Sequence, residues 1–210
     1  MNEARIAAFI TANLRLEPVP GVPQVSLYTA HQRSGISRVA DDTPPYWAWP
    51  WAGGIVLARH VLRHPELVAS RRVLDFGAGG GLVAIAAAKA GAARVFAAES
   101  DPKGLVAIGL NAQANAVRLL AGPIETTPPG APMADVVLAG DVFYAPEVAA
   151  MALPFLTRCA AAGRDVLVGD PFRRDLPVDR LDLLAEDEVA DFGSGSARPV
   201  RAGVFRLSAG

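Results

Sequence analysis

The stretch that decides the fold is VLDFGAGGG, residues 73–81. The apolar run RRVLDF (71–76) leads into it and is typical of a buried parallel strand. The segment LVAIAAAKA (82–90) follows and has the length and alanine content of a helix. Glycines at 77, 79 and 81 let the backbone turn sharply and approach a ligand closely. The pattern therefore predicts a strand, a glycine-rich ligand loop and a helix.

The same alternation continues along the chain. Further strands are expected at 93–98, near 118–121, at 134–141 and at 164–170. Helices are expected from Asp101-Pro102 to about residue 115, and from 146 to 163 with a kink or break at Pro154. Such repeated units, joined by right-handed crossovers, predict a doubly wound, mostly parallel, Rossmann-like α/β sheet. Ligands of such sheets bind at the carboxyl ends of the strands.

The two ends of the chain follow other patterns. Residues 186–192 and 199–207, joined by GSGSARP, indicate an antiparallel pair that closes one edge of the sheet. The 210 residues suit a single domain (1–210), in which we expect an N-terminal extension (1–70) and a ligand-binding core (71–210). The extension is expected to hold an N-terminal helix, an irregular proline-rich stretch (17–50) and a helix (52–64).

The composition excludes several classes of protein. A formal net charge of −1 offers no broad basic field for nucleic acid. The single cysteine, Cys159, excludes an intramolecular disulfide and is expected to be a small core residue. No apolar run approaches the roughly 20 residues that span a bilayer, and the N-terminal apolar run is too short for a signal peptide. We therefore expect a cytoplasmic protein that binds neither membrane nor nucleic acid and has no metal site. The sequence leaves the oligomeric state open, with a monomer favoured.

Two acids discriminate between the possible ligands of the glycine loop. A dinucleotide pattern, G-x-G-x-x-A, can be read from Gly79. However, Asp75 precedes Gly77 by two residues, and a carboxylate there would repel a pyrophosphate but suit the ammonium group of S-adenosylmethionine. Glu99, 22 residues after Gly77, is placed to accept ribose hydroxyls of either NAD or S-adenosylmethionine. The loop as a whole favours S-adenosylmethionine.

With these residues in place, the sequence resembles the class I S-adenosylmethionine-dependent methyltransferases. Four further segments make it similar to the electron transfer flavoprotein β-subunit lysine methyltransferase family and its bacterial relatives, over roughly residues 10–208. They are YWAWPWAGGIVLARHVL (46–62), AGDVFY (139–144), VLVGDPFRRDLP (166–177) and VRAGVFRL (200–207). The resemblance implies a seven-stranded sheet with an antiparallel closing strand.

The resemblance also implies roles for particular residues. The methionine end of the cofactor would be held by Asp75, Gly77, Ala78, Gly79 and Gly81. Glu99 would hold the ribose and Trp51 would pack at the cofactor. Asp141, also beside the cofactor, and Tyr144 would line the channel for the target lysine. Two positions depart from the family pattern: Glu125 is the nearest acid for the adenine amino group, and Ala145 stands where another acid is expected.

The resemblance therefore implies an S-adenosylmethionine-dependent N-methyltransferase acting on lysines of a protein, the electron transfer flavoprotein β subunit or a similar one. A small-molecule amine N-methyltransferase and, more remotely, an NAD(P)-dependent oxidoreductase are the alternatives. An inactive cofactor-binding relative and a nucleic-acid amino-methyltransferase are less consistent with the residues. The last would need an amide or acid where TPPY has Thr43.

Some of these residues also have purely structural interpretations. Asp141 could cap the helix that begins near Pro146, Tyr144 could be a core aromatic, and Asp170 is expected to form a turn. The three tryptophans, at 47, 49 and 51, alternate like strand residues. This spacing predicts that Trp47 and Trp51 share a face toward the cofactor, while Trp49 packs the extension onto the sheet.

Overall fold

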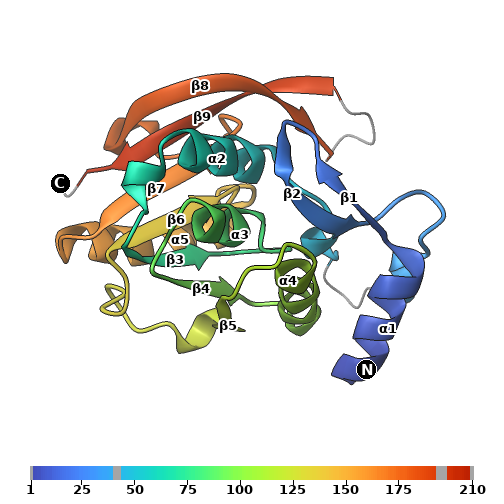
Figure 1. Cartoon of the computed structure of the whole chain (residues 1–210). Coiled ribbons are helices and arrows are strands. Elements are labelled where there is room, and N and C mark those ends of the chain that lie inside the picture. Colours follow the sequence, from blue (N-terminus) through green and yellow to red (C-terminus); the bar gives the residue numbers. More distant parts are fainter. Residues whose placement is uncertain (1, 40–43, 193–197, 209–210) are drawn as a thin grey trace.

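The computed structural model describes residues 2–39, 44–192 and 198–208, and within them a seven-stranded sheet forms the centre of the molecule (Figure 1). The strand order is β5-β4-β3-β6-β7-β9-β8. The strands are β3 (Arg72–Phe76), β4 (Arg94–Glu99), β5 (Leu120–Pro123), β6 (Val136–Gly140), β7 (Asp165–Asp170), β8 (Leu181–Asp191) and β9 (Arg198–Leu207). Only β9 runs against its neighbours, so the predicted doubly wound, mostly parallel sheet is confirmed.

The predicted antiparallel pair at the end of the chain is also present. β9 pairs with β7 on one side and with β8 on the other, so the antiparallel strand lies inside the sheet and β8 forms its edge. β8 begins at Leu181, earlier than expected. Residues 193–197 of the expected GSGSARP turn lie outside the described residues.

Helices cover both faces of the sheet because the central strands alternate their side chains between two cores. Val73, Val136 and Leu138 pack with α2 (Ala52–Arg63) and α3 (Leu82–Lys89) on one face. Leu74, Val137 and Ala139 pack with α5 (Pro146–Ala161) on the other. Helix α2 thus shares its core with the strands that follow residue 71.

The helix boundaries follow from local signals. In α4 (Pro102–Ala114) the Asp101 carboxylate accepts from the main-chain N–H of Lys103 at 2.8 Å, as the Asp-Pro signal predicts. Helix α5 contains Pro154 but continues through it, so the expected break there is wrong. Cys159 is completely buried in α5, as predicted. None of the helices in the described part of the chain is long and apolar enough to cross a membrane.

The N-terminal region is more regular than the sequence suggests. After helix α1 (Glu3–Asn13), strands β1 (Arg15–Val19) and β2 (Val22–Thr29) form an antiparallel hairpin. The expectation of an irregular stretch from residue 17 is therefore wrong up to residue 29. The turn uses Gly21 at a φ of +79°, a conformation that favours glycine.

Candidate active site

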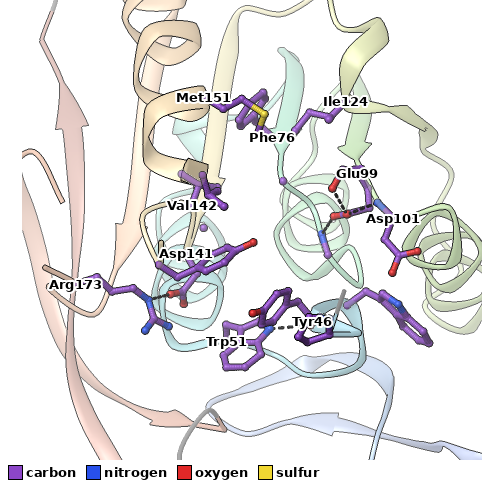
Figure 2. A pocket seen from close by; sticks show the side chains of 18 of the residues that line it. Tyr46, Trp51, Phe76, Glu99, Asp101, Ile124, Asp141, Val142, Met151 and Arg173 are labelled. Carbon is purple, nitrogen blue, oxygen red and sulfur yellow. Dashed lines mark hydrogen bonds and ion pairs between the residues drawn. The ribbon is translucent and has the colours of Figure 1, made fainter. Parts of the chain in front are cut away.

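A cavity of about 540 Å³ opens at the carboxyl ends of β3, β4 and β6 (Figure 2). Its volume is within the range of about 300–1,000 Å³ that small-molecule sites occupy. Figure 2 shows Glu99 and Asp141 on opposite sides of it, Phe76, Met151 and Ile124 at one end, and Tyr46 and Trp51 at the other. The cavity is where a doubly wound sheet is expected to bind its ligand.

The glycine loop forms one wall of the cavity. Gly77, Gly79 and Gly81 have φ values of +72°, +54° and +86°, which side chains larger than hydrogen rarely adopt. The main-chain N–H groups of Gly77 and Ala78 both donate to the Ala98 carbonyl, at 3.0 and 2.9 Å. The loop is therefore fixed to the neighbouring strand β4. Its glycines have no side chains that could occupy the cavity beside it.

A smaller cavity, of about 50 Å³, adjoins the first behind this loop. Asp75 lines it and is 1% exposed. One carboxylate oxygen, Oδ2, accepts from the N–H of Ala84 at 2.9 Å, but no described residue donates to Oδ1. Burial raises the pKa of Asp75 to about 7. A buried carboxylate oxygen without a partner suits a ligand that brings a cationic hydrogen-bond donor. The ammonium group of a methionyl moiety is such a donor.

Glu99 binds the loop from the opposite side. Its Oε2 accepts from the N–H of Gly79 at 2.6 Å and its Oε1 accepts from the N–H of Asp101 at 2.9 Å. Burial raises the pKa of this carboxylate, and those two hydrogen bonds oppose the increase. Glu125, the acid suggested for the adenine end, is exposed and does not line the cavity, whereas its neighbour Ile124 does.

Asp141 follows β6 and is held by hydrogen bonds from α2 and from the turn after β7. Its backbone has a φ of +59°, its Oδ2 accepts from the N–H of Gly53 at 2.5 Å, and its Oδ1 accepts from Nε of Arg173 at 2.5 Å. Burial raises the pKa of Asp141, while Arg173 and the Gly53 N–H favour the charged form. The alternative that Asp141 caps helix α5 is wrong, because Ala145 occupies that position and no side chain caps the helix.

Tyr46, Trp51 and Tyr144 contribute aromatic rings to the lining of the cavity, and Tyr46 and Tyr144 are partly exposed to solvent. Tyr46 lies 5.1 Å from Tyr144 and 5.8 Å from Trp51 between ring centroids, and Nε1 of Trp51 donates to the Tyr46 carbonyl at 2.7 Å. Tyr144 is 42% exposed, so the alternative of a core aromatic is wrong; Phe143 is the buried one. Ring faces and edges here can contact an aliphatic or cationic side chain that enters from solvent.

The tryptophans do not alternate as strand residues. Tyr46–Ala48 forms a turn of 3₁₀ helix. The side chains of residues 47, 49 and 51 therefore do not alternate between two faces of a strand. Trp47 and Trp51 line the larger cavity as expected, although Trp47 is 3% exposed and packs against α1. Trp49 packs against the same α1 cluster and also lines the smaller cavity, so the prediction that only Trp47 and Trp51 face the ligand site is wrong.

The sequence did not single out Arg173, which lines the cavity from the turn after β7. That turn is set by Asp170, whose Oδ1 accepts from the N–H of Arg173 at 2.6 Å, as expected for a turn-forming aspartate. The segment 166–177 did enter the family resemblance, but nothing local tells Arg173 from Arg174, which is exposed. No group of three or more His, Cys, Asp or Glu among the described residues could hold a metal ion.

Comparisons with known proteins agree with this geometry. Residues 62–142 match the protein-family model of ribosomal protein L11 methyltransferase (PrmA). The electron transfer flavoprotein β-subunit lysine methyltransferase of Xenopus laevis is 39% identical over 195 residues, which cover 88% of this chain and 79% of that protein. The enzyme of the same name from Rattus norvegicus is 39% identical over 133 residues, which cover 61% of this chain and 51% of the relative. The chain thus spans about half the length of the mammalian relatives that it matches.

Solved structures support the fold. A 16S rRNA methyltransferase of T. thermophilus superposes with a TM-score of 0.52 at 20% identity, over 80% of this chain and 44% of that one. At this identity the likeness extends to the fold alone.

Proposed function

The chain belongs to the electron transfer flavoprotein β-subunit lysine methyltransferase family, whose members are class I S-adenosylmethionine-dependent methyltransferases, and we propose that it methylates lysine side chains of a protein. The substrate we propose is the electron transfer flavoprotein β subunit or a similar protein. The observation that carries the proposal is the larger cavity, which has Glu99 and Asp141 on opposite sides and the aromatic side chains Tyr46, Trp51 and Tyr144 in its lining (Figure 2).

The residues around the glycine loop fit the cofactor. We assign the ammonium of the methionyl group to the unpaired oxygen of Asp75 and the ribose to Glu99. Gly77, Ala78, Gly79 and Gly81 supply the close main-chain approach, and Trp51 lines both cavities beside them. S-adenosylmethionine supplies a methyl group already activated by its sulfonium, so the protein mainly has to align the acceptor and exclude water.

The acceptor must reach the cavity as a free amine. A lysine of pKa about 10.4 has to lose a proton at a cost of roughly 4–5 kcal/mol at pH 7. Partial burial of the amine between Tyr144, Tyr46 and Trp51 would lower its pKa and reduce this cost. Water takes the proton as the amine enters.

In this proposal Asp141 orients the acceptor rather than acting as the base. Each of its oxygens already accepts one hydrogen bond, from Gly53 and from Arg173, and each keeps a second lone pair. These two partners favour the charged carboxylate and hold it as a well-directed acceptor for an N–H of the amine. Tyr144 provides an apolar wall for the aliphatic part of the lysine.

The direct test incubates the purified protein and labelled S-adenosylmethionine with recombinant electron transfer flavoprotein. We expect label in the β subunit, on lysines that mass spectrometry can locate. Asp141→Ala should retain cofactor binding and lose methyl transfer, while Asp179→Ala, at an exposed acid outside the cavity, should behave as the unchanged protein.

Two results would contradict the proposal. Label found only in small molecules would favour the amine N-methyltransferase alternative. Unchanged turnover by Asp141→Ala would remove Asp141 from the site. A cytoplasmic location and a monomeric state stay predictions from the sequence, to be checked by fractionation and by analytical ultracentrifugation.

A further inference from the structure

The guanidinium group of Arg173 interacts with several carboxylates at the side of the cavity where Asp141 lies. Nε of Arg173 donates to Oδ1 of Asp141, and Asp170 and Asp191 are close enough to act electrostatically on Arg173 as well. The Asp141 side chain is 6% exposed and the Arg173 side chain is 27% exposed. The pair therefore lies largely out of water, where charges interact strongly and a lone charge is costly.

The surroundings of Asp141 are otherwise acidic. The titratable groups that share its turn or its cavity, apart from Arg173, are Asp170, Asp191, Glu99, Asp101, Tyr46 and Tyr144. None of these six becomes a cation, and helix α2 contributes a main-chain N–H from its first turn. Among the described residues that line the cavity, Arg173 is thus the one cationic side chain.

Asp170 adds a second buried carboxyl group close to Asp141 and Arg173. It is completely buried, its Oδ2 receives no hydrogen bond from a described residue, and burial raises its pKa to about 7. The charge of Asp141 contributes to the raised pKa of Asp170, and the charge of Asp191 raises the pKa of Asp141. Arg173, in the turn after β7, opposes both increases with its positive charge.

We propose that Arg173 is a positioning residue, which keeps Asp141 charged and directed into the cavity so that Asp141 can receive the acceptor amine. The role as a positioner of the acceptor rests on the proposed function, because it concerns the methyl-transfer step. The state of Asp141 itself does not depend on that function. Arginine suits the task because it stays charged at every physiological pH and its planar group donates in a fixed direction.

The simpler alternative is that Arg173 only ties the turn after β7 to the end of β6. Its loss would then lower stability without changing the ionisation of Asp141. Three variants separate the two roles: Arg173→Gln removes the charge, Arg173→Lys keeps it, and Arg174→Gln is the matched control at the exposed neighbour.

The first measurement needs no substrate. In protein labelled with ¹³C at aspartate carboxyl groups, the Asp141 signal is assigned by its absence from Asp141→Asn and is titrated in each variant. We expect Arg173→Gln to raise the pKa of Asp141 by at least about one unit, equivalent to a tenfold change in the ionisation equilibrium. Arg173→Lys should restore most of the difference and Arg174→Gln should show none. An unchanged Asp141 titration in Arg173→Gln overturns the proposal.

The second measurement follows methyl transfer to the flavoprotein β subunit between pH 6 and pH 9. The rate ratio of the unchanged protein to Arg173→Gln should increase as the pH falls below the pKa of Asp141 in the variant, up to the factor that the shift of this pKa gives. It should approach one as the pH rises above the new pKa of Asp141, with cofactor affinity unchanged. A ratio that is equal at every pH supports the purely structural role. If the unchanged protein transfers no methyl, the proposed function fails, while the titration still decides whether Arg173 controls Asp141.

Discussion

The side-chain amide of Asn111, on α4, donates to the carbonyl of Gly80 in the glycine loop at 2.8 Å. Asn111 is completely buried, and its oxygen accepts from the N–H of Tyr28 on β2 at 2.8 Å. One side chain therefore joins the N-terminal hairpin, helix α4 and the loop that lines the cavity. The hairpin is thus coupled to the ligand site although none of its residues lines the larger cavity.

Replacing Asn111 by leucine tests this coupling. The change leaves the Gly80 carbonyl and the Tyr28 N–H without their partner, at a cost of about 1–3 kcal/mol for each buried group. We expect lower stability in urea and weaker binding of S-adenosylmethionine by calorimetry. Gln113→Leu, at an exposed position of the same helix, is the control and should change stability by less than about 0.5 kcal/mol. Equal behaviour of the two variants would show that the contact is unimportant.

The sequence suggests two acids for the nucleoside part of the cofactor, Glu99 and Glu125, and cofactor binding by their glutamine variants distinguishes them. Glu99→Gln loses an acceptor for the N–H of Gly79 or of Asp101 and should weaken cofactor binding by at least about tenfold, or 1.4 kcal/mol. Glu125→Gln should bind as the unchanged protein because Glu125 is exposed and outside the cavity. Calorimetric titration measures both, and a comparable loss in Glu125→Gln would mean that Glu125 contacts the ligand after all.

The stability of the ligand-free protein should decrease as the pH rises. Burial raises the pKa values of Asp75 and Asp170 from 3.8 to about 7, so the folded state binds protons more tightly than the unfolded one. This contribution is complete below pH about 4 and is lost as the pH rises through about 7. We expect a higher melting temperature at pH 5 than at pH 8, and a smaller difference in Asp75→Asn.

The cofactor provides an internal check on the pH dependence. If its ammonium pairs with Asp75, S-adenosylmethionine should raise the melting temperature more at pH 8, where Asp75 is charged, than at pH 5. A stabilisation that is the same at both pH values would argue against that pairing.

Tyr144 should act through its ring rather than through its hydroxyl. Its ring centroid lies 5.1 Å from that of Tyr46, and both rings line the cavity. Tyr144→Phe should therefore retain most of the methyl-transfer rate. Tyr144→Ala should raise the KM for the protein acceptor, with little change in the affinity for S-adenosylmethionine. A large loss in Tyr144→Phe would instead assign the hydroxyl a direct role.

Two glycines provide a matched pair for packing at the site. A Cβ on Gly53 would lie 2.2 Å from the Gly169 carbonyl oxygen and 2.8 Å from the Asp141 nitrogen, so Gly53→Ala should destabilise by about 1–3 kcal/mol and displace Asp141. A Cβ on Gly109 would meet no atom within 4 Å, so Gly109→Ala should stabilise α4 by roughly 0.5–1 kcal/mol. Urea denaturation measures both changes.

The features that the sequence predicted are those with a strong local signal. The strand, loop and helix around Asp75 and Gly77 follow from apolar runs and glycine spacing, and the start of α4 follows from Asp101-Pro102. The hairpin was missed because Pro18 and Pro23 argue against strands, although a two-stranded sheet with exposed edges tolerates proline.

The missed parts of the site depend on tertiary contacts. The spacing of Trp47, Trp49 and Trp51 fits a strand, yet the chain forms a 3₁₀ turn that packs against α1 and against Gly80. Arg173 was missed because its partner Asp141 lies 32 positions earlier, at the end of another strand. Only the register of β6 beside β7 brings them together.

The position of β9 has a consequence for the order in which the sheet can assemble. This strand, Arg198–Leu207, is the last one described and is inserted between two strands that the ribosome delivers earlier. Until it emerges, β7 and β8 cannot join the same sheet, and β7 exposes an unpaired edge beside the strands that are already paired. Any state in which β9 has not docked therefore leaves the edge of β7 unpaired, and an open strand edge of this kind can pair with another chain.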